Sequence, residues 1–493
     1  MLHRTLLALC VGVFSLAAAA QDALPPGVLA ALKAADVPAE ALYAAAIPLA
    51  HRAPPWQYRA LEPVQPGSTM KLVTSIVALD RIGAQQRGFT ELRSAAPLAG
   101  DVLQGDLVLK GGADVELDAA RLWALLVDLR QRGIARIEGD LLVDRTLFRP
   151  ARLDVGLPPF DESPEAYYNV IPDAVYLNGN LLPLELSATA DGVRASTVPA
   201  LAGLTVDSRM QLIDGPCGDW DEHWRAATVT REEGRTRITL NGAFPRDCTQ
   251  RTAFQLLDRL EMEERLFRTL WEGLGGSWTG RAREAAGPAS SQLLARHAAR
   301  PWGEVLRHLN KTSDNAEARL LFLLLGVPAM AANPQASTAE LAAREVRAWF
   351  ADNRIDATGL VLDNGSGLSR SERISPWQMV SLLKAAWGSR HAHDFIATLP
   401  TAGVDGTLRN RLKNGPATGW ARLKTGTLKN VVALAGYVND SRGRPWAVAM
   451  MVNHDKAGQA RPVLDALVDA FARSTPTRFF KPAQTVGPQG SGP

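Results

Sequence analysis

The order of apolar and polar residues predicts a strand pair and a helix near the start of the chain. Residues 42–50 are a mostly apolar run of strand length, and they could pair as strands with residues 57–62, with Pro54 and Pro55 in the connection. Residues 67–83 carry apolar side chains at helical spacing, with Pro66 before the first turn and Gly83 at the end. We therefore expect two paired strands followed by a helix that begins directly after the proline.

Residues 86–286 have a different pattern, with short strands and glycine-containing turns. Apolar runs with Gly-Asp turns occupy residues 101–112 and 137–144, and a helical stretch at residues 119–133 lies between them. Residues 235–242 alternate between polar and apolar side chains after a polar turn, which is typical of a β-hairpin. This segment reads as a large β-rich insertion, which we divide into two subdomains.

Helical spacing returns after residue 287, and strands return near the C-terminus. The predicted elements are helices at 302–326, 337–353 and 375–387, strands at 421–430, 431–440 and 445–453, and a helix at 462–474. This order predicts an α/β (α+β) domain in which helices flank an antiparallel sheet built from both ends of the chain. We assign residues 21–85 and 287–475 to this domain, and the Gly- and Pro-rich residues 476–493 to a flexible tail.

The first twenty residues have the layout of a secretory signal peptide. His3 and Arg4 give a basic start, an apolar stretch follows, and a run of alanines ends at Ala20. The apolar stretch is too short to span a bilayer comfortably. Cys10 follows Leu9, whereas a lipoprotein signal requires a small residue there, so we do not expect lipidation. The sequence therefore predicts export to the periplasm, with at most peripheral association with the membrane.

Length and charge limit the classes of function. A chain of 493 residues is too long for one ordinary domain, and an apolar fraction of 46% is enough for a sizeable core. The 54 basic and 51 acidic side chains give a net charge of +3, and removal of Arg4 with the signal peptide lowers it by one. This balance gives no argument for nucleic acid as a partner.

Cys217 and Cys248 are the two cysteines that remain after signal-peptide cleavage. They either form a disulfide or lie as two buried thiols. Export to an oxidising compartment favours the disulfide, which would stabilise the fold by about 3–4 kcal/mol.

Ser68 and Lys71 are three residues apart at the predicted helix start, so their side chains share one face. A helix N-terminus stabilises negative charge, and a desolvated lysine can accept a proton. These features suit a catalytic serine. Ser-x-x-Lys is also common by chance, and the first turn of an ordinary amphipathic helix looks the same.

Two later stretches are ambiguous when taken alone. Residues 313–315, Ser-Asp-Asn, precede a helical run and read as a helix N-cap. Residues 424–427, Lys-Thr-Gly-Thr, lie in a predicted strand, where a glycine often marks the close approach of another backbone or a ligand. The edge of such a strand could hold an added peptide strand.

Together, Ser-x-x-Lys, Ser-x-Asn and Lys-Thr-Gly, in this order, are the motif set of serine β-lactamases and penicillin-binding proteins. The long gap between the first two motifs contains the β-rich insertion, whereas a β-lactamase has a much shorter gap. The chain therefore resembles the D-alanyl-D-alanine carboxypeptidase/endopeptidase family, the class C low-molecular-mass penicillin-binding proteins of peptidase family S13. Residues 105–117 and 363–370 look like the same family, and the resemblance covers about residues 27–475.

The resemblance implies a serine hydrolase that acts on peptidoglycan stem peptides ending in D-Ala-D-Ala. Ser68 would be the nucleophile and Lys71 the base for acylation. Ser313 would relay a proton to the leaving amine, Asn315 would bind the substrate amide, and Lys424 would attract the terminal carboxylate. β-Lactams would acylate the same serine and leave slowly. No cofactor or metal is expected.

The resemblance also implies substrate-binding residues on the predicted strand. Thr425 would bind the terminal carboxylate, and Gly426 would let the strand approach the substrate. The backbone N–H groups of Ser68 and Thr427 would form the oxyanion hole.

Three further residues have competing interpretations. Arg370 either reaches acidic groups of the stem peptide or is a surface arginine. Asp144 either meets the amino group of a diaminopimelate side chain, on a weak match, or is an ordinary turn residue. Lys429 either favours an anionic substrate or faces solvent.

Other readings find less support in the sequence. There is no Gly-x-Ser-x-Gly elbow. His391, His393 and Asp394 lack the helical His-Glu-x-x-His pattern of a zinc site and read as a solvated helix end. A serine β-lactamase remains an alternative, although no deacylating base is evident, as does an inactive wall-binding homologue, which the intact motifs disfavour.

Overall fold

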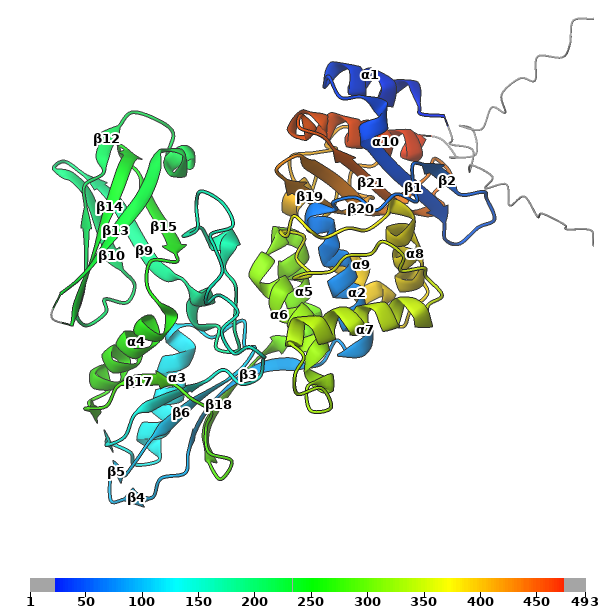
Figure 1. Ribbon diagram of the computed structural model, residues 1–493. Helices are drawn as coiled ribbons and strands as arrows, with labels where there is room; N and C mark the ends of the chain where they lie inside the picture. Colours follow the sequence, from blue (N-terminus) through cyan, green and yellow to red (C-terminus); the bar gives the residue numbers. More distant parts are fainter. Residues whose placement is uncertain (1–22, 233, 474–493) are drawn as a thin grey trace, which may run out of the picture.

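The computed structural model describes residues 23–232 and 234–473, so the expected signal peptide and most of the expected tail lie outside the described residues. Two lobes are joined where β3 and β18 meet the helices around α6 (Figure 1). We call them the first lobe, which contains both ends of the described chain, and the inserted lobe. Within the described residues, none of the helices is both long enough and apolar enough to span a membrane.

A five-stranded antiparallel sheet in the order β19-β20-β21-β1-β2 forms the centre of the first lobe. Its strands are β1 (Leu42–Pro48), β2 (Trp56–Tyr58), β19 (Arg422–Leu428), β20 (Val431–Asn439) and β21 (Pro445–Asn453). Alternate side chains enter different cores. Ala44 and Ala46 pack on one face, whereas Ala45 and Ile47 pack on the other.

Helices cover both faces of this sheet (Figure 1). One face packs against α1 (Pro26–Ala34) and α10 (Arg461–Arg473). The other side carries α2 (Lys71–Arg81), α5 (Trp302–His308), α6 (Asn315–Gly326), α7 (Thr338–Asp352), α8 (Pro376–Trp387) and α9 (Ala392–Thr398). The predicted fold class, an antiparallel sheet from both chain ends flanked by helices, is confirmed.

The inserted lobe contains two mixed sheets and two helices next to the first lobe. One sheet has the order β17-β8-β6-β3-β18 and the other β16-β7-β5-β4. Their bounds are β3 (Arg87–Ser94), β4 (Leu98–Ala99), β5 (Val102–Leu103), β6 (Leu107–Gly112), β7 (Arg136–Ile137), β8 (Leu141–Asp144), β16 (Ser277–Trp278), β17 (Ala282–Glu284) and β18 (Gln292–Pro301), with α3 (Ala119–Gln131) and α4 (Arg259–Gly273).

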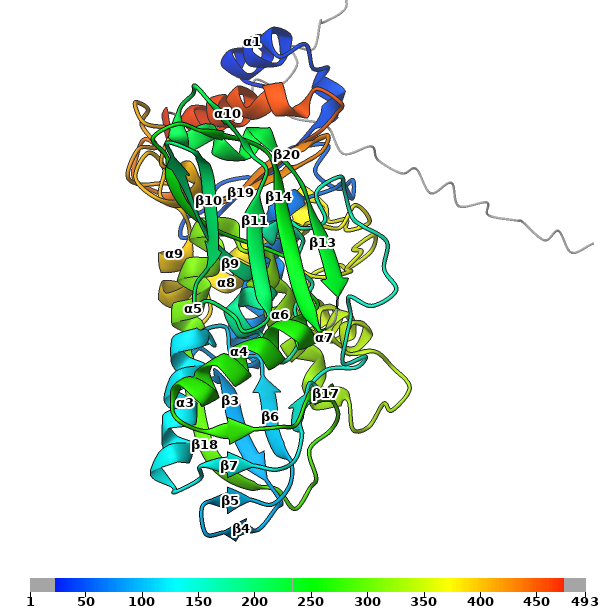
Figure 2. The same cartoon turned by 90° about the vertical axis from the view of Figure 1, so that its left-hand side faces the viewer.

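The outer part of the inserted lobe is built mainly from strands, with the 3₁₀ turn η5 (Cys217–His223) between β12 and β13. Figure 2 shows its long strands β13 and β14 side by side above α4. The sheets are β10-β9-β15 and β11-β14-β12, with β13 paired to β14. Their bounds are β9 (Leu182–Thr189), β10 (Gly192–Thr197), β11 (Leu204–Ser208), β12 (Gln211–Ile213), β13 (Trp224–Glu232), β14 (Arg235–Pro245) and β15 (Thr249–Phe254). Both parts of the lobe contribute to one continuous hydrophobic core.

Two features of the inserted lobe differ from the sequence-based expectation. Strand β18 pairs with β3, so the inserted sheet extends to Pro301 rather than ending at residue 286. Helix α4 lies in a stretch that we expected to be β-rich; its amphipathic sequence buries Leu266, Phe267 and Trp271 in the lobe's core.

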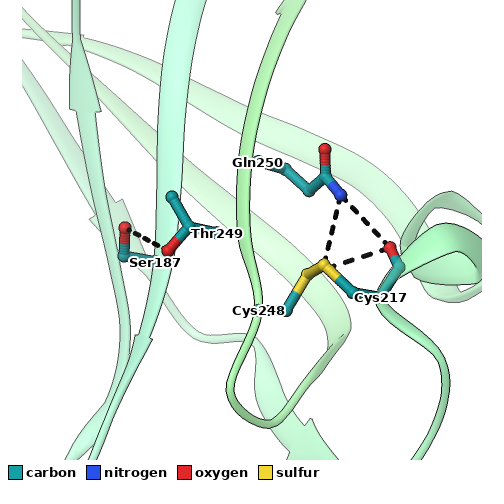
Figure 3. Close-up of a disulfide and its surroundings, with 5 residues drawn as sticks. All are labelled: Ser187, Cys217, Cys248, Thr249 and Gln250. Carbon is teal, nitrogen blue, oxygen red and sulfur yellow. Dashed lines mark hydrogen bonds between the residues drawn. A yellow bond between two sulfur atoms is a disulfide. The ribbon is translucent and has the colours of Figure 1, made fainter.

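Cys217 and Cys248 form a disulfide in the outer part of the inserted lobe (Figure 3). Their Cα atoms lie 5.3 Å apart, within the usual range for a bridged pair. The side-chain amide of Gln250 donates a hydrogen bond to the carbonyl oxygen of Cys217 at 3.3 Å. This arrangement agrees with the pairing that export favours.

Candidate active site

Ser68 and Lys71 lie where a short 3₁₀ turn passes into a helix. The turn η2 (Gly67–Met70) leads directly into α2, and Lys71 is the first residue of that helix. Nζ of Lys71 lies 2.9 Å from Oγ of Ser68. The predicted pair is in hydrogen-bonding contact, at a helix start that is 3₁₀ rather than α-helical.

Lys71 is fully buried, and oxygen atoms surround its amine. Nζ donates to Oδ1 of Asn315 and to the carbonyl oxygen of Ser366, each at 2.6 Å. Burial disfavours the charged form and lowers the pKa of Lys71 from 10.5 to about 7, although two nearby carboxylates act in the opposite direction. A substantial share of this lysine is therefore unprotonated at neutral pH, as a general base requires.

The segment 363–372 packs against the Lys71 amine. The buried carboxylate of Glu372 accepts hydrogen bonds from backbone N–H groups of the segment, including that of Gly367 at 2.8 Å. Gly367 has a φ of +80°, and a Cβ there would lie 1.9 Å from the carbonyl oxygen of Gly67. Only glycine at position 367 therefore allows segment 363–372 to pack against the turn that carries Ser68. This packing brings the carbonyl oxygen of Ser366 to the amine of Lys71.

Ser313 and Asn315 lie at a strained turn between two helices. α5 passes into the π-helical turn η6 (Leu309–Ser313), and α6 begins at Asn315. Ser313 has a φ of +67°, which serine rarely adopts, and such turns are frequent at functional sites. Its Oγ accepts a hydrogen bond from Nζ of Lys424 at 2.8 Å. Lys424 is fully buried, and that burial lowers its pKa well below the usual value.

Strand β19 runs directly beside the nucleophile turn. A Cβ on Gly426 would lie 2.5 Å from the carbonyl oxygen of Pro66 and 3.2 Å from the backbone nitrogen of Ser68. A Cβ on Gly67 would lie 3.2 Å from the backbone nitrogen of Thr427. The backbone nitrogens of Ser68 and Thr427, the two groups that we expect to form an oxyanion hole, thus lie on two adjacent segments.

A cavity of about 810 Å³ lies beside Ser68. Its lining residues are Ser68, Phe160, Asp161, Glu162, Tyr167, Tyr168, His308, Thr312, Ser313, Asp314, Asn315, Leu368, Arg370, Thr427, Leu428 and Lys429. The guanidinium of Arg370 lies over the ring of Phe160, 4.9 Å from its centre. Thr425 lies two residues before Thr427 in β19, and its Oγ1 is 2.8 Å from Oγ1 of Thr407. Arg370 and Lys429 therefore border the same cavity as Ser68, Ser313 and Asn315, whereas Lys71, Lys424 and Thr425 are not among its lining residues.

Asp144 makes its contacts away from the motif residues, and these contacts favour the second of its two interpretations, an ordinary turn residue. It lies at the end of β8 in the inserted lobe and is 5% exposed. Its carboxylate accepts hydrogen bonds from the backbone N–H groups of Thr146 at 3.0 Å and Gly287 at 3.1 Å. Among the described residues, Asp144 is not one of those that line the cavity beside Ser68. It is a turn residue that fixes neighbouring backbone.

Besides Asp314, the acids that line the cavity are Asp161 and Glu162, which come from an irregular segment just before the 3₁₀ turn η3 (Tyr167–Asn169). Asp161 and Glu162 precede Tyr167 and Tyr168, and the carbonyl oxygen of Tyr168 accepts a hydrogen bond from Nδ2 of Asn315 at 2.9 Å. Sequence reasoning missed these residues because the segment has no helical or strand period. The signal available was the cluster of acids and tyrosines in residues 160–168, directly after Pro158 and Pro159.

Comparison with known proteins agrees with this geometry. A model of the D-Ala-D-Ala carboxypeptidase 3 (S13) family matches residues 30–473. The chain is 30% identical over 427 residues to a D-alanyl-D-alanine carboxypeptidase of Actinomadura sp. (strain R39), which covers 83% of this chain and 76% of that protein. It is 27% identical over 400 residues to D-alanyl-D-alanine carboxypeptidase DacB of Haemophilus influenzae, with 79% of this chain and 81% of that protein covered.

A solved structure shares the fold. The crystal structure of penicillin binding protein 4 (dacB) from Haemophilus influenzae has a TM-score of 0.70 at 23% identity, and the match covers 90% of this chain and 99% of that chain. The order of the three motifs, the interrupted sheet domain and the family match over most of the sequence all agree. The chain belongs to the D-Ala-D-Ala carboxypeptidase 3 (S13) family.

Proposed function

We propose that this protein is a serine D-Ala-D-Ala carboxypeptidase and endopeptidase that cleaves peptidoglycan stem peptides through an acyl-enzyme on Ser68. The observation that carries the proposal is the 2.9 Å contact between the Ser68 hydroxyl and the buried amine of Lys71. Two curated relatives are D-alanyl-D-alanine carboxypeptidases, which supports the same reaction here.

Lys71 serves as the base for acylation. Its Nζ donates to the oxygens of Asn315 and Ser366, and these two bonds use both N–H groups of a neutral amine. The lone pair is then free to accept the hydroxyl proton of Ser68, which leaves Oγ to attack the carbonyl of the penultimate D-alanine. The new C–O bond forms as the proton moves to Nζ.

The remaining motif residues stabilise the negative charge that the attack produces, transfer a proton to the leaving amine and bind the substrate. The backbone N–H groups of Ser68 and Thr427 stabilise the oxyanion, typically by about 3–4 kcal/mol. Ser313 passes a proton to the departing amine, and the terminal carboxylate binds near Lys424 and Thr425. Water then hydrolyses the ester and regenerates the free serine.

The charges around the cavity suit a stem peptide, which carries both carboxylates and an amine. Arg370 and Lys429 supply positive charge, and Asp161 and Glu162 supply negative charge. A β-lactam offers a similar acyl carbonyl, so we propose that it acylates Ser68 and is released slowly. A related Haemophilus influenzae structure is a complex with a β-lactam. The predicted signal peptide would bring the enzyme to the periplasm, where this substrate lies.

The proposal is tested by incubating the purified full chain with a pentapeptide that ends in D-Ala-D-Ala and measuring free D-alanine. We expect release by the wild-type protein and none by Ser68→Ala. A folded wild-type protein that releases no D-alanine from this peptide or from isolated peptidoglycan would refute it.

A further inference from the structure

His308 and Glu317 make a contact across the turn that carries Ser313. His308 is the last residue of α5, Glu317 lies in the first turn of α6, and the π-helical turn η6 lies between the two helices. Nδ1 of His308 is 3.0 Å and 3.1 Å from the two carboxylate oxygens of Glu317. The pair therefore joins the two helices at the base of the turn.

One member of the pair borders the cavity beside Ser68, and the other is buried behind it. The side chain of Glu317 is 11% exposed, whereas that of His308 is 49% exposed and lines the cavity beside Ser68. The backbone N–H of Glu317 donates to Oδ1 of Asp314 at 2.8 Å, and Asp314 lies directly between Ser313 and Asn315. Glu317 is thus attached to the turn by its backbone and to α5 by its side chain.

We infer that the His308–Glu317 pair positions Ser313 and Asn315 for acylation, an inference that rests on the function proposed above. Ser313 has a φ of +67°, and a strained conformation of this kind persists only when its surroundings hold it. The contact across the turn supplies that support by fixing the helix on either side. Both members of the pair are positioning residues, because they act through the turn.

Several ionisable groups surround the pair. The charge of Asp314, in the turn, raises the pKa of both His308 and Glu317, and the charge of Arg300, at the end of β18, lowers both. The buried side chain of Tyr176 faces Asp314 and Glu317. Arg300 is itself paired with Glu116, and Tyr168 from the neighbouring 3₁₀ turn lines the same cavity. The nearest opposite charge for each member of the pair is therefore its partner.

The pair is expected to respond to pH. The hydrogen bond to Glu317 raises the pKa of His308, and burial raises the pKa of Glu317 to about 7. The contact with Glu317 therefore stabilises the folded protein when His308 is protonated. This stabilisation is fully present below the unfolded-state pKa of His308 and is lost as pH rises through its higher folded-state pKa. Acylation should therefore weaken on the alkaline side, where Glu317 loses its positive partner.

The test measures the rate at which a fluorescent penicillin acylates the full chain, as a function of pH. The variants are His308→Ala, Glu317→Gln and the matched control His297→Ala. His297 makes a similar contact in the inserted lobe, with Nδ1 2.7 Å from Oδ2 of Asp114. Unfolding temperatures are recorded for all variants.

We expect His308→Ala to acylate about 10–100-fold more slowly, because small misplacements of catalytic groups are costly. Glu317→Gln keeps an acceptor for neutral His308, so its rate at neutral pH should stay within about threefold of wild type, while the alkaline decline disappears. His297→Ala should acylate normally.

Wild-type rates and pH dependence in His308→Ala would overturn the inference, as would an equal fall in His297→Ala. If His308→Ala fails to fold, Glu317→Gln with an unchanged alkaline decline would overturn it on its own. A wild-type protein that is not acylated at all would count against the proposed function instead, so the two failures are distinguishable.

Discussion

Nζ of Lys71 lies 2.6 Å from Oδ1 of Asn315, although the two residues are 244 positions apart in the chain. This contact joins the first two motifs directly. The side-chain amide of Asn315 can therefore fix the orientation of the Lys71 amine and influence its pKa.

The pH dependence of acylation should report the state of Lys71. Because burial lowers its pKa to about 7, the free amine predominates above that pH, and acylation should fall about tenfold per pH unit below it. Lys71→Arg, which stays protonated, should acylate about 10²–10⁴-fold more slowly. Stopped-flow measurement with a fluorescent penicillin from pH 5 to 9 checks both expectations. A flat profile between pH 5 and 7 would exclude Lys71 as the base.

Asn315→Asp should shift that profile. A carboxylate in place of the amide oxygen would favour the ammonium form of Lys71, so its pKa should rise and the acidic limb should move to higher pH. Asn315→Ala serves as the control, since it removes the contact without adding charge. The same stopped-flow series measures both variants, and an unshifted limb in Asn315→Asp would contradict the assigned contact.

Much of the site could be predicted from sequence because its residues lie in three short motifs with fixed spacing. The helix start at Ser68 and the strand at residues 422–428 were also predictable from local periodicity and from Pro66. The motifs, the helix start and this strand depend on near neighbours in the chain. The sheet built from both chain ends pairs distant residues, such as Leu42 and Val452, and it was predictable only from the order of the elements.

Other features depend on distant contacts and could not be predicted in this way. The low pKa of Lys71 arises from full burial under segment 363–372, which no local pattern reveals. The π-helical turn before Asp314 interrupts the helix predicted at residues 302–326; only the N-cap reading of residues 313–315 indicated a break, and Asp314 is indeed the N-cap of α6. Asp144 matched a short family stretch, yet its neighbours in space are Thr146 and Gly287.

Arg145→Met should destabilise the inserted lobe strongly. The buried guanidinium of Arg145 contacts Asp173 at 3.1 Å and Glu263 at 2.6 Å, so its loss leaves two buried acids without this partner. We expect a loss of about 3–5 kcal/mol in the free energy of unfolding, measured by urea denaturation. Arg237→Met, which breaks an exposed pair in the same lobe, should cost no more than about 1 kcal/mol. Equal effects of both changes would contradict this account.

The disulfide should be intact in protein secreted to an oxidising compartment. Mass spectrometry under non-reducing conditions should find Cys217 and Cys248 in one linked peptide, with a mass two hydrogens below that of the reduced pair. The double variant Cys217→Ser/Cys248→Ser should lose about 3 kcal/mol of stability in urea denaturation. Two free thiols in the secreted protein would contradict the pairing.

The most direct test of the central claim is time-resolved intact-mass spectrometry of the protein with a penicillin, followed by peptide mapping. The acyl-enzyme account predicts one adduct per chain, located on Ser68, that persists for minutes or longer and is absent from Ser68→Ala. An adduct that disappears within seconds would indicate a β-lactamase. An adduct on another residue, or none on the folded wild-type protein, would contradict the assignment of Ser68 as the nucleophile.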